Sequence, residues 1–174
     1  NSLTLMELKT LNEIEIISAP HSKISEVDFE NLTFGNVFTD HMLVCDYVDG
    51  AWQKPVIEPY APFMIDPSAK VFHYGQAIFE GMKAYKDEQD DVWLFRPDEN
   101  YHRFNKSATR MAMPEVPEDI FLGGLHRLLE IEKEWVKKGK GNTLYIRPFM
   151  IATGHGVIAA PSQEYRFMII LSPA

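Results

Sequence analysis

Residues 82–111, MKAYKDEQDDVWLFRPDENYHRFNKSATRM, contain the pattern that decides the fold. Two β-rich runs, residues 82–85 and 92–95, lie on either side of a polar stretch, and this arrangement predicts a β-hairpin. Pro97 fits the first turn of a helix, and the acidic residues that follow it favour a helix N-terminus. The sequence therefore predicts a hairpin that leads directly into a helix.

The chain before this stretch is also rich in β signals. Residues 42–47 and 52–57 are β-rich and meet around Asp49-Gly50, a pair that tolerates positive φ and therefore predicts a second hairpin. A short strand is expected near Ile16 within an otherwise extended arm. Residues 77–83 are predicted to form one helical turn.

The chain after this stretch predicts one long helix and two strands. Pro117 opens the helix and Gly139 closes it, with Gly124 near its start indicating close packing. The strands are expected at residues 143–152 and 165–171. The predicted buried stripe of the helix is Phe121, Leu125, Leu128, Leu129 and Trp135.

These elements predict an α+β fold, in which helices pack on an antiparallel sheet. We expect an N-terminal arm at residues 1–30, one domain at 31–171, and the start of an interdomain linker at 172–174. Seventeen basic against twenty-five acidic residues give a net charge of -8, which argues against a nucleic-acid partner. No apolar run approaches the roughly 20 residues of a membrane span. Cys45, the single cysteine, is expected in the core, and a cytoplasmic location is expected.

Two arginines stand out in a chain that has no nucleotide-binding, metalloprotease or nucleophile-elbow motif. Arg147 lies in an otherwise apolar strand, and Arg103 lies within a helix. An inward guanidinium needs anionic or carbonyl partners. For Arg147, contact with solvent, an internal ion pair and an anion site remain open, and for Arg103, contact with solvent and an anion site remain open. No metal site is expected.

Four segments together resemble the N-terminal domain of branched-chain amino acid aminotransferases, which are fold-type IV pyridoxal-phosphate enzymes. They are HMLV at 41–44, FHYGQAIFEGMKAYK at 72–86, LFRPDENYHRFNKSATRM at 94–111 and LYIRPFMI at 144–151. The resemblance implies the smaller, N-terminal domain of that architecture. It also implies transfer of the amino group of leucine, isoleucine or valine to 2-oxoglutarate with pyridoxal 5′-phosphate, in a homodimer or larger homo-oligomer.

The resemblance assigns roles to individual residues. Arg103 matches the arginine that binds the phosphate of the cofactor, and Phe79 matches an apolar wall for the aliphatic side chain. Arg147 and Tyr74 match groups that accept the distal carboxylate of glutamate, and Tyr145 matches one that orients the α-carboxylate. We therefore expect Arg103 and Arg147 to face one open concavity flanked by Tyr74 and Phe79.

The loop at Val157 to Ala159 matches one that reaches into the neighbouring subunit's pocket, although its sequence GHGVIAAP departs from common versions. His73, Glu80 and His155 are assigned structural roles.

The Schiff-base lysine of the family lies in its second domain, and no lysine of this chain matches it, Lys83 included. The 174-residue segment alone is therefore expected to hold no catalytic residue, to bind the cofactor weakly if at all, and to be inactive. Two alternatives remain. One is a D-amino acid aminotransferase or aminodeoxychorismate lyase of the same superfamily, and the other is a non-catalytic binding or assembly domain.

Overall fold

One large sheet organises the part of the chain that the structure describes, residues 2–4 and 14–174 of a computed structural model. Its strands are β1 (Ser2–Thr4), β2 (Glu15–Ile16), β3 (His41–Val48), β4 (Ala51–Trp52), β5 (Val56–Pro59), β6 (Ala77–Phe79), β7 (Met82–Lys86), β8 (Val92–Phe95), β9 (Leu144–Ala152) and β10 (Tyr165–Pro173). Their order is β1-β8-β7-β9-β10-β3-β5-β2, with β4 paired to β3 and β6 paired to β9. The described pairings are antiparallel except that of β2 with β5. Residues 5–13 of the predicted arm lie outside the described residues.

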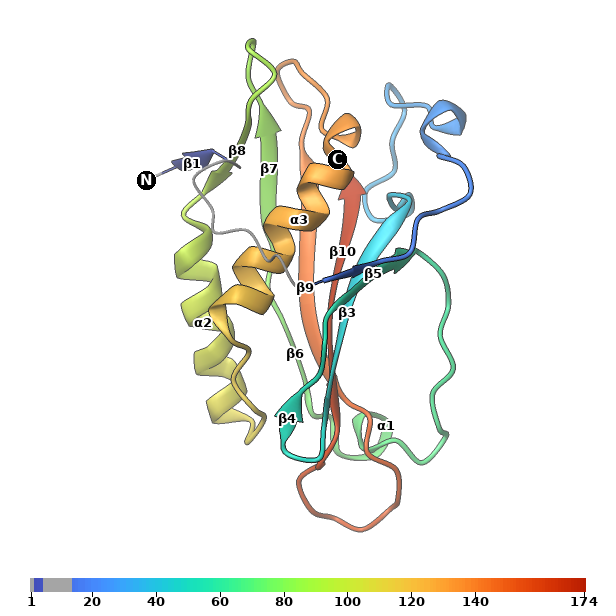
Figure 1. Cartoon of the computed structure of the whole chain (residues 1–174), viewed down its shortest axis with the longest axis vertical. Helices are drawn as coiled ribbons and strands as arrows, with labels where there is room; N and C mark the ends of the chain where they lie inside the picture. Colours follow the sequence, from blue (N-terminus) through green and yellow to red (C-terminus); the bar gives the residue numbers. More distant parts are fainter. Residues whose placement is uncertain (1, 5–13) are drawn as a thin grey trace.

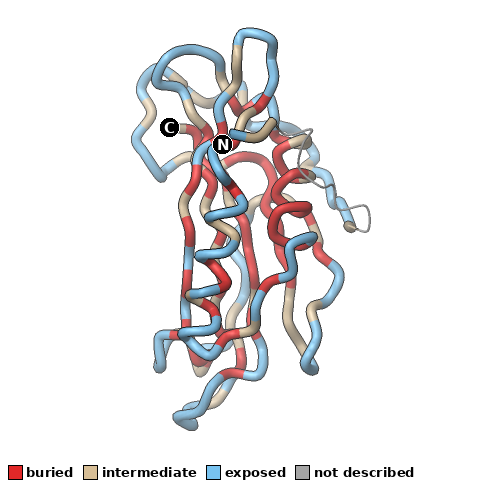
Figure 2. The backbone as a smooth tube through the Cα atoms, turned by 90° about the vertical axis from the view of Figure 1, so that its left-hand side faces the viewer, coloured by how far each residue is buried: buried red, intermediate tan, exposed pale blue. Residues whose placement is uncertain are grey.

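The helices α2 (Pro97–Arg110) and α3 (Gly124–Ile131) pack on one face of this sheet (Figure 1). Phe104 of α2 and Leu125 of α3 share a fully buried core with Ile146 of β9 and Phe167 of β10. Figure 2 shows the buried residues concentrated where the helices meet the strands. The predicted α+β fold, with helices on an antiparallel sheet, is confirmed.

Both predicted hairpins are present. β3 and β4 pair through Val48 and Ala51, and the two residues between them, Asp49 and Gly50, have φ values of 53° and 76°. A two-residue turn with positive φ at both positions matches the twist of the flanking strands. β7 and β8 form the second hairpin, and α2 begins at Pro97 as predicted.

The long helix predicted from Pro117 to Gly139 is shorter than expected. A π-helical turn at Asp119–Gly123 leads into α3, which ends at Ile131, and a 3₁₀ turn follows at Lys133–Trp135. A Cβ on Gly124 would lie 2.8 Å from Leu43 Cδ2, so the predicted close packing is confirmed. The residues of the predicted stripe, Phe121, Leu125, Leu128, Leu129 and Trp135, are all buried.

Glu132 explains why the helix stops early. Its buried carboxylate accepts a hydrogen bond from the Asp40 backbone N–H at 3.0 Å and contacts His41 Nδ1 at 2.5 Å. The Trp135 indole donates to Asp40 Oδ2 at 3.1 Å. These contacts with the start of β3 draw the chain out of the helical path, and tertiary contacts of this kind override helix propensity.

The helical turn predicted at residues 77–83 is wrong. A short helix, α1 (Lys70–Tyr74), lies upstream and ends at Gly75, whose φ is 66°. The following residues form β6, because β9 offers them backbone partners along Ala77–Phe79. Pairing with a strand far along the same chain therefore makes this segment a strand and not a helix.

β9 directs its side chains alternately to the two faces of the sheet. Its residues alternate between buried positions, which face the core with Ile146, and half-buried positions that include Tyr145 and Arg147. Within the described residues, no helix is both long enough and apolar enough to cross a membrane. Cys45 is buried as predicted, and burial raises the pKa of its thiol to about 12, with the charge of Asp46 adding to the effect.

Candidate functional site

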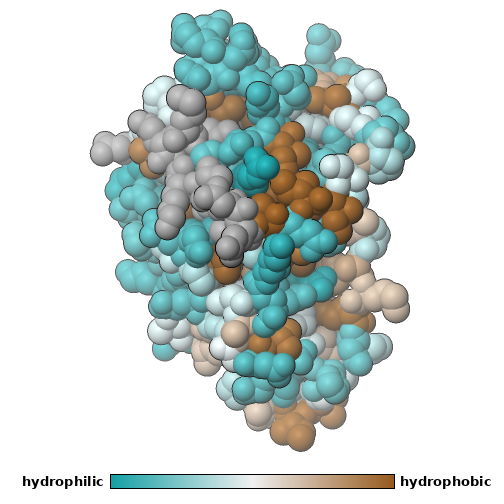
Figure 3. Space-filling model, viewed as in Figure 1, coloured by the Kyte–Doolittle hydropathy of each residue, from teal (hydrophilic) through white to brown (hydrophobic). Residues whose placement is uncertain are grey.

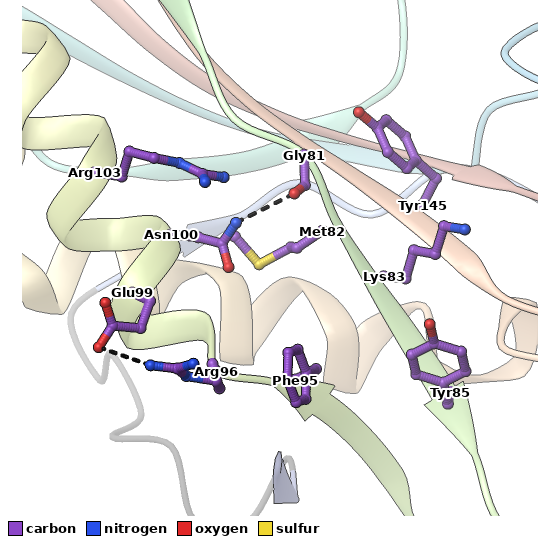
Figure 4. Close-up of a pocket in the computed structure, with 10 residues that line it drawn as sticks. All are labelled: Gly81, Met82, Lys83, Tyr85, Phe95, Arg96, Glu99, Asn100, Arg103 and Tyr145. Atoms are coloured by element: carbon purple, nitrogen blue, oxygen red, sulfur yellow. Dashed lines mark hydrogen bonds and ion pairs between the residues drawn. The ribbon is translucent and has the colours of Figure 1, made fainter. Parts of the chain in front are cut away.

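A hollow of about 600 Å³ opens between the N-terminal half of α2 and the strand β7. Figure 4 shows the α2 side chains on one side of it and the β7 residues on the other, with Tyr145 of β9 beyond them. Its lining residues are Gly81, Met82, Lys83, Tyr85, Phe95, Arg96, Glu99, Asn100, Arg103 and Tyr145. Three of these are cations and one is acidic, so an acidic chain has a cationic hollow here, which suits an anionic ligand.

Two residues, Glu80 and Gly81, separate β6 from β7, and Gly81 lines this hollow. Phe79 pairs with Phe149 and Met82 pairs with Ile146, so both short strands keep a single register with β9. Alternation along such a strand sends neighbouring side chains to opposite faces. Accordingly Phe79 is 64% exposed, whereas Glu80 is 6% exposed.

Arg103 reaches from α2 to this buried carboxylate. Its Nε lies 2.5 Å from Glu80 Oε1, and its Nη2 lies 2.8 Å from Glu80 Oε2. Asn100, one turn earlier, donates from Nδ2 to Glu80 Oε2 at 3.0 Å and to the Gly81 carbonyl at 3.2 Å. The arginine is thus both in an internal ion pair and exposed, since 69% of its side-chain surface is accessible.

The electrostatics of this pair follow from its hydrogen bonds. Burial alone would raise the pKa of Glu80, but the hydrogen bonds from Arg103 and Asn100 outweigh burial and hold that pKa below its usual value. The same pair raises the pKa of Arg103. Both groups are therefore charged at neutral pH.

Tyr145 and Arg147 meet on the open face of the sheet. Arg147 Nη2 donates to Tyr145 Oη at 2.8 Å, and its guanidinium carbon lies 4.4 Å from the centre of the Phe79 ring. The Arg147 Nε is buried and has no hydrogen-bond partner among the residues the structure describes. A guanidinium with an unused buried donor between two aromatic rings is suited to binding an oxygen ligand.

The sequence predicted a single concavity that contains both Arg103 and Arg147, but the structure places these residues in two separate hollows. Arg103 and Tyr145 line the first, whereas Phe79 and Arg147 line a second, largely apolar hollow of about 320 Å³. The rest of its lining is Ala77, Ile78, Phe149, Ile151 and Ile170. The hydrogen bond between Tyr145 and Arg147 connects the two hollows.

Tyr74 lines neither of these hollows. Its hydroxyl donates to the Val157 carbonyl, so the structure groups it with the predicted subunit loop instead of with Arg147. Lys70, which is buried, supports the same loop by donating to the carbonyls of Ile158 at 2.6 Å and Ala160 at 3.0 Å.

Residues 157–160, which include Val157 and Ala159, are exposed. Val157 is 66% and Ile158 is 77% accessible, and Figure 3 shows hydrophobic surface at the lower end of the molecule, where this loop lies in Figure 1. The loop therefore presents apolar side chains to solvent from a backbone that is held in place.

Phe34 contacts the site residue Tyr145, and sequence reasoning did not indicate this contact. Its ring centre lies 5.1 Å from that of Tyr145 in an edge-on arrangement, and the residue is 61% exposed. It belongs to an irregular segment without periodicity, so no sequence pattern indicated it. Glu80 was assigned a structural role, and its pairing with Arg103 was likewise not foreseen.

Comparison with known proteins identifies relatives of the chain. A protein of Bacillus subtilis (strain 168), described as branched-chain-amino-acid transaminase 1, is 53% identical over 147 residues, which cover 84% of this chain and 41% of the relative. A branched-chain-amino-acid aminotransferase of Mycolicibacterium smegmatis is 45% identical over 153 residues, covering 87% of this chain and 42% of the relative. The chain is homologous to one segment of the branched-chain-amino-acid aminotransferases. It spans about 41% of the length of such relatives, and no protein-family model matches it.

Solved aminotransferase structures share the fold of this segment. The branched-chain amino acid aminotransferase of Escherichia coli superposes with a TM-score of 0.52 at 19% identity, over 75% of this chain and 39% of that one. The enzyme of Thermobaculum terrenum gives a TM-score of 0.53 at 17% identity, over 74% of this chain and 39% of that one. Part of the aminotransferase architecture, as predicted, is thereby confirmed.

Proposed function

We propose that this segment belongs to a transaminase that moves the amino group of leucine, isoleucine or valine to 2-oxoglutarate with pyridoxal 5′-phosphate. The observation that carries the proposal is the cationic hollow, in which Arg103 faces Tyr145 across Gly81. The homology to branched-chain-amino-acid aminotransferases supports it.

The donors of the hollow fit a phosphate dianion. Arg103 uses Nε and Nη2 for Glu80, and its Nη1 has no hydrogen-bond partner among the described residues. A guanidinium is permanently charged and offers paired N–H groups to phosphate oxygens. Lys83 and Arg96 add positive charge to the lining of the same hollow. The bound cofactor would supply an electron sink at the substrate's α-carbon.

The second hollow fits the two kinds of substrate side chain. Phe79, Phe149 and Ile151 offer an apolar surface for a branched aliphatic group. Arg147 lies at the same hollow and can bind the distal carboxylate of glutamate or 2-oxoglutarate. Tyr145, which already accepts a hydrogen bond from Arg147, would orient the α-carboxylate between the two hollows.

The remaining parts of the active site come from outside this segment. The lysine that carries the cofactor is assigned to the second domain of the whole protein, so the segment alone is expected to be inactive. Tyr74 and the loop at Val157 and Ala159 would serve the pocket of a second copy of the chain, in keeping with their position away from Arg147.

The test compares pyridoxal phosphate with pyridoxal, which lacks the phosphate. In the whole apoprotein, Arg103→Met should weaken pyridoxal phosphate binding by about tenfold or more, because a charged hydrogen bond contributes ~1.5–3 kcal/mol. Pyridoxal binding should change little. Equal losses for both compounds would refute the phosphate assignment. Activity with leucine and none with D-alanine is expected, and the reverse would reassign the substrate class.

A further inference from the structure

Glu80 has no part in the proposed function so far, yet it makes the closest polar contacts of Arg103. It is 6% exposed, and it receives three hydrogen bonds from α2, two of them from one guanidinium. A buried carboxylate normally needs such compensation, so these contacts alone are compatible with a structural role. The orientation in which these contacts hold the Arg103 guanidinium indicates a role in ligand binding as well.

We infer that Glu80 is a positioning residue for the cofactor phosphate, because it fixes Arg103 so that one edge of the guanidinium is offered to the hollow. This inference rests on the proposed function. Glu80 takes the Nε and Nη2 side of the group, which leaves Nη1 and the second Nη2 hydrogen free of partners among the described residues. Arg103 lines the hollow whereas Glu80 does not, so a phosphate there would meet the guanidinium first.

Fixing the guanidinium matters because Arg103 is otherwise an exposed, flexible side chain. A long side chain loses rotamer freedom when it binds a ligand, and a group that is already held loses less of it on binding. Asn100 strengthens the arrangement, since it ties Glu80 to the Gly81 carbonyl and thereby to the wall of the hollow. The three residues connect α2 to the gap between β6 and β7.

Two effects of Glu80 on phosphate binding oppose one another. Its negative charge repels a dianion, so removing the charge alone would tighten binding. Its hold on Arg103 improves the geometry of the phosphate contacts, so removing that hold would weaken binding. We expect geometry to dominate, because the exposed guanidinium lines the hollow whereas the buried carboxylate does not.

The experiment measures the affinity of the whole apoprotein for pyridoxal phosphate and for pyridoxal in four single variants and in one double variant, which combines Glu80→Gln with Arg103→Met. Glu80→Gln removes the charge and one acceptor, and Glu80→Asp keeps the charge but shortens the reach. Glu99→Gln is the matched control, because it removes one negative charge from the same hollow without touching Arg103; its carboxylate pairs with Arg96 at 3.4 Å. Arg103→Met supplies the reference, and urea unfolding checks that each variant is folded.

The expected pattern is specific to the phosphate. Glu80→Gln and Glu80→Asp should each weaken pyridoxal phosphate binding by about tenfold and leave pyridoxal binding within about twofold, while Glu99→Gln should bind pyridoxal phosphate as well as or better than the parent. In the Arg103→Met background, Glu80→Gln should have no further effect.

Other results would contradict either the positioning role of Glu80 or the phosphate assignment of Arg103. Unchanged or tighter binding of pyridoxal phosphate by Glu80→Gln would overturn the positioning role, and so would equal losses for pyridoxal. If Glu80→Gln does not fold, Glu80→Asp decides in the same way. A normal phosphate-dependent affinity in Arg103→Met would instead refute the phosphate assignment of Arg103 on which the proposed function rests, and this outcome is independent of the Glu80 variants.

Discussion

The hydroxyl of Tyr145 lies where a side chain at residue 81 would have to begin. A Cβ built on Gly81 would be 2.4 Å from Tyr145 Oη and 3.1 Å from Cζ of the same ring. The hydroxyl in turn accepts the hydrogen bond from Arg147. The absence of a side chain at Gly81 therefore permits the observed position of the Tyr145 hydroxyl and its hydrogen bond with Arg147, at the junction of the two hollows.

Gly81→Ala should displace Tyr145 and break its hydrogen bond with Arg147. We expect kcat/KM with leucine to fall by about tenfold or more in the whole protein, and stability to fall by ~1–3 kcal/mol, as for other overpacked sites. Tyr145→Phe removes the atom that would clash most. Gly81→Ala should therefore cost less in a Tyr145→Phe background, and an equal cost in both backgrounds would contradict the steric explanation.

Arg147→Met should separate the two kinds of substrate. The variant keeps an apolar side chain over Phe79 but loses the charge, so KM for glutamate should rise by about tenfold while KM for leucine changes by less than about threefold. The matched control is Arg166→Met, because Arg166 lies on the same face of the sheet and already pairs with Asp46 at 2.8 Å. Equal increases of KM for both substrates would remove Arg147 from the carboxylate role.

Glu80 predicts a pH dependence of stability. Its pKa is lower in the folded protein than in the unfolded chain, so its contribution is fully present above the ordinary value of about 4.3 and is lost as pH falls through the folded pKa. The difference in free energy of unfolding between the parent and Glu80→Gln should shrink below about pH 4.3. Because Arg103 is largely exposed, solvent screens the pair and the effect should be small. Urea unfolding at several pH values measures it, and a difference that grows with acidity would contradict the ion-pair assignment.

Glu132 should matter more for stability than for activity. Glu132→Ala would leave the Asp40 N–H and the His41 ring without their buried partner, and each orphaned group costs ~1–3 kcal/mol. We expect a loss of about 2–4 kcal/mol in urea unfolding. Glu134→Ala, two residues away and exposed, should change stability by less than about 0.5 kcal/mol. Equal effects of both substitutions would show that the network contributes little.

The elements that the sequence predicted well are those decided by neighbouring residues. The turn at Asp49-Gly50 and the start of α2 at Pro97 both depend on backbone preferences of one or two residues. The strand predicted at residues 143–152 is likewise present as β9, and its alternation places Tyr145 and Arg147, two positions apart, on one face.

The elements that it predicted poorly depend on distant partners. The helix ends at Ile131 because Glu132 contacts His41, a residue 91 positions earlier in the chain. Phe34 reached Tyr145 through a segment without periodic pattern. Glu80 and Arg103 are 23 positions apart, and only the packing of α2 against the gap between β6 and β7 brings them together. Long-range contacts of this kind leave no local signal in a single sequence.

The last prediction concerns Lys70, whose buried ammonium group holds the loop that carries Val157. Lys70→Met keeps the packing volume but removes the hydrogen bonds to the carbonyls of Ile158 and Ala160. Because two of the loop's anchors disappear, the backbone amides of residues 155–160 should exchange hydrogen about tenfold faster or more. If this loop serves a second copy, KM for leucine should rise in the whole protein as well. Lys54→Met, at an exposed lysine, should change neither quantity. Unchanged exchange in Lys70→Met would show that the remaining contacts, among them the Tyr74 hydroxyl and the hydrogen bond from the Gly156 N–H to Ser68 Oγ, are enough to hold the loop.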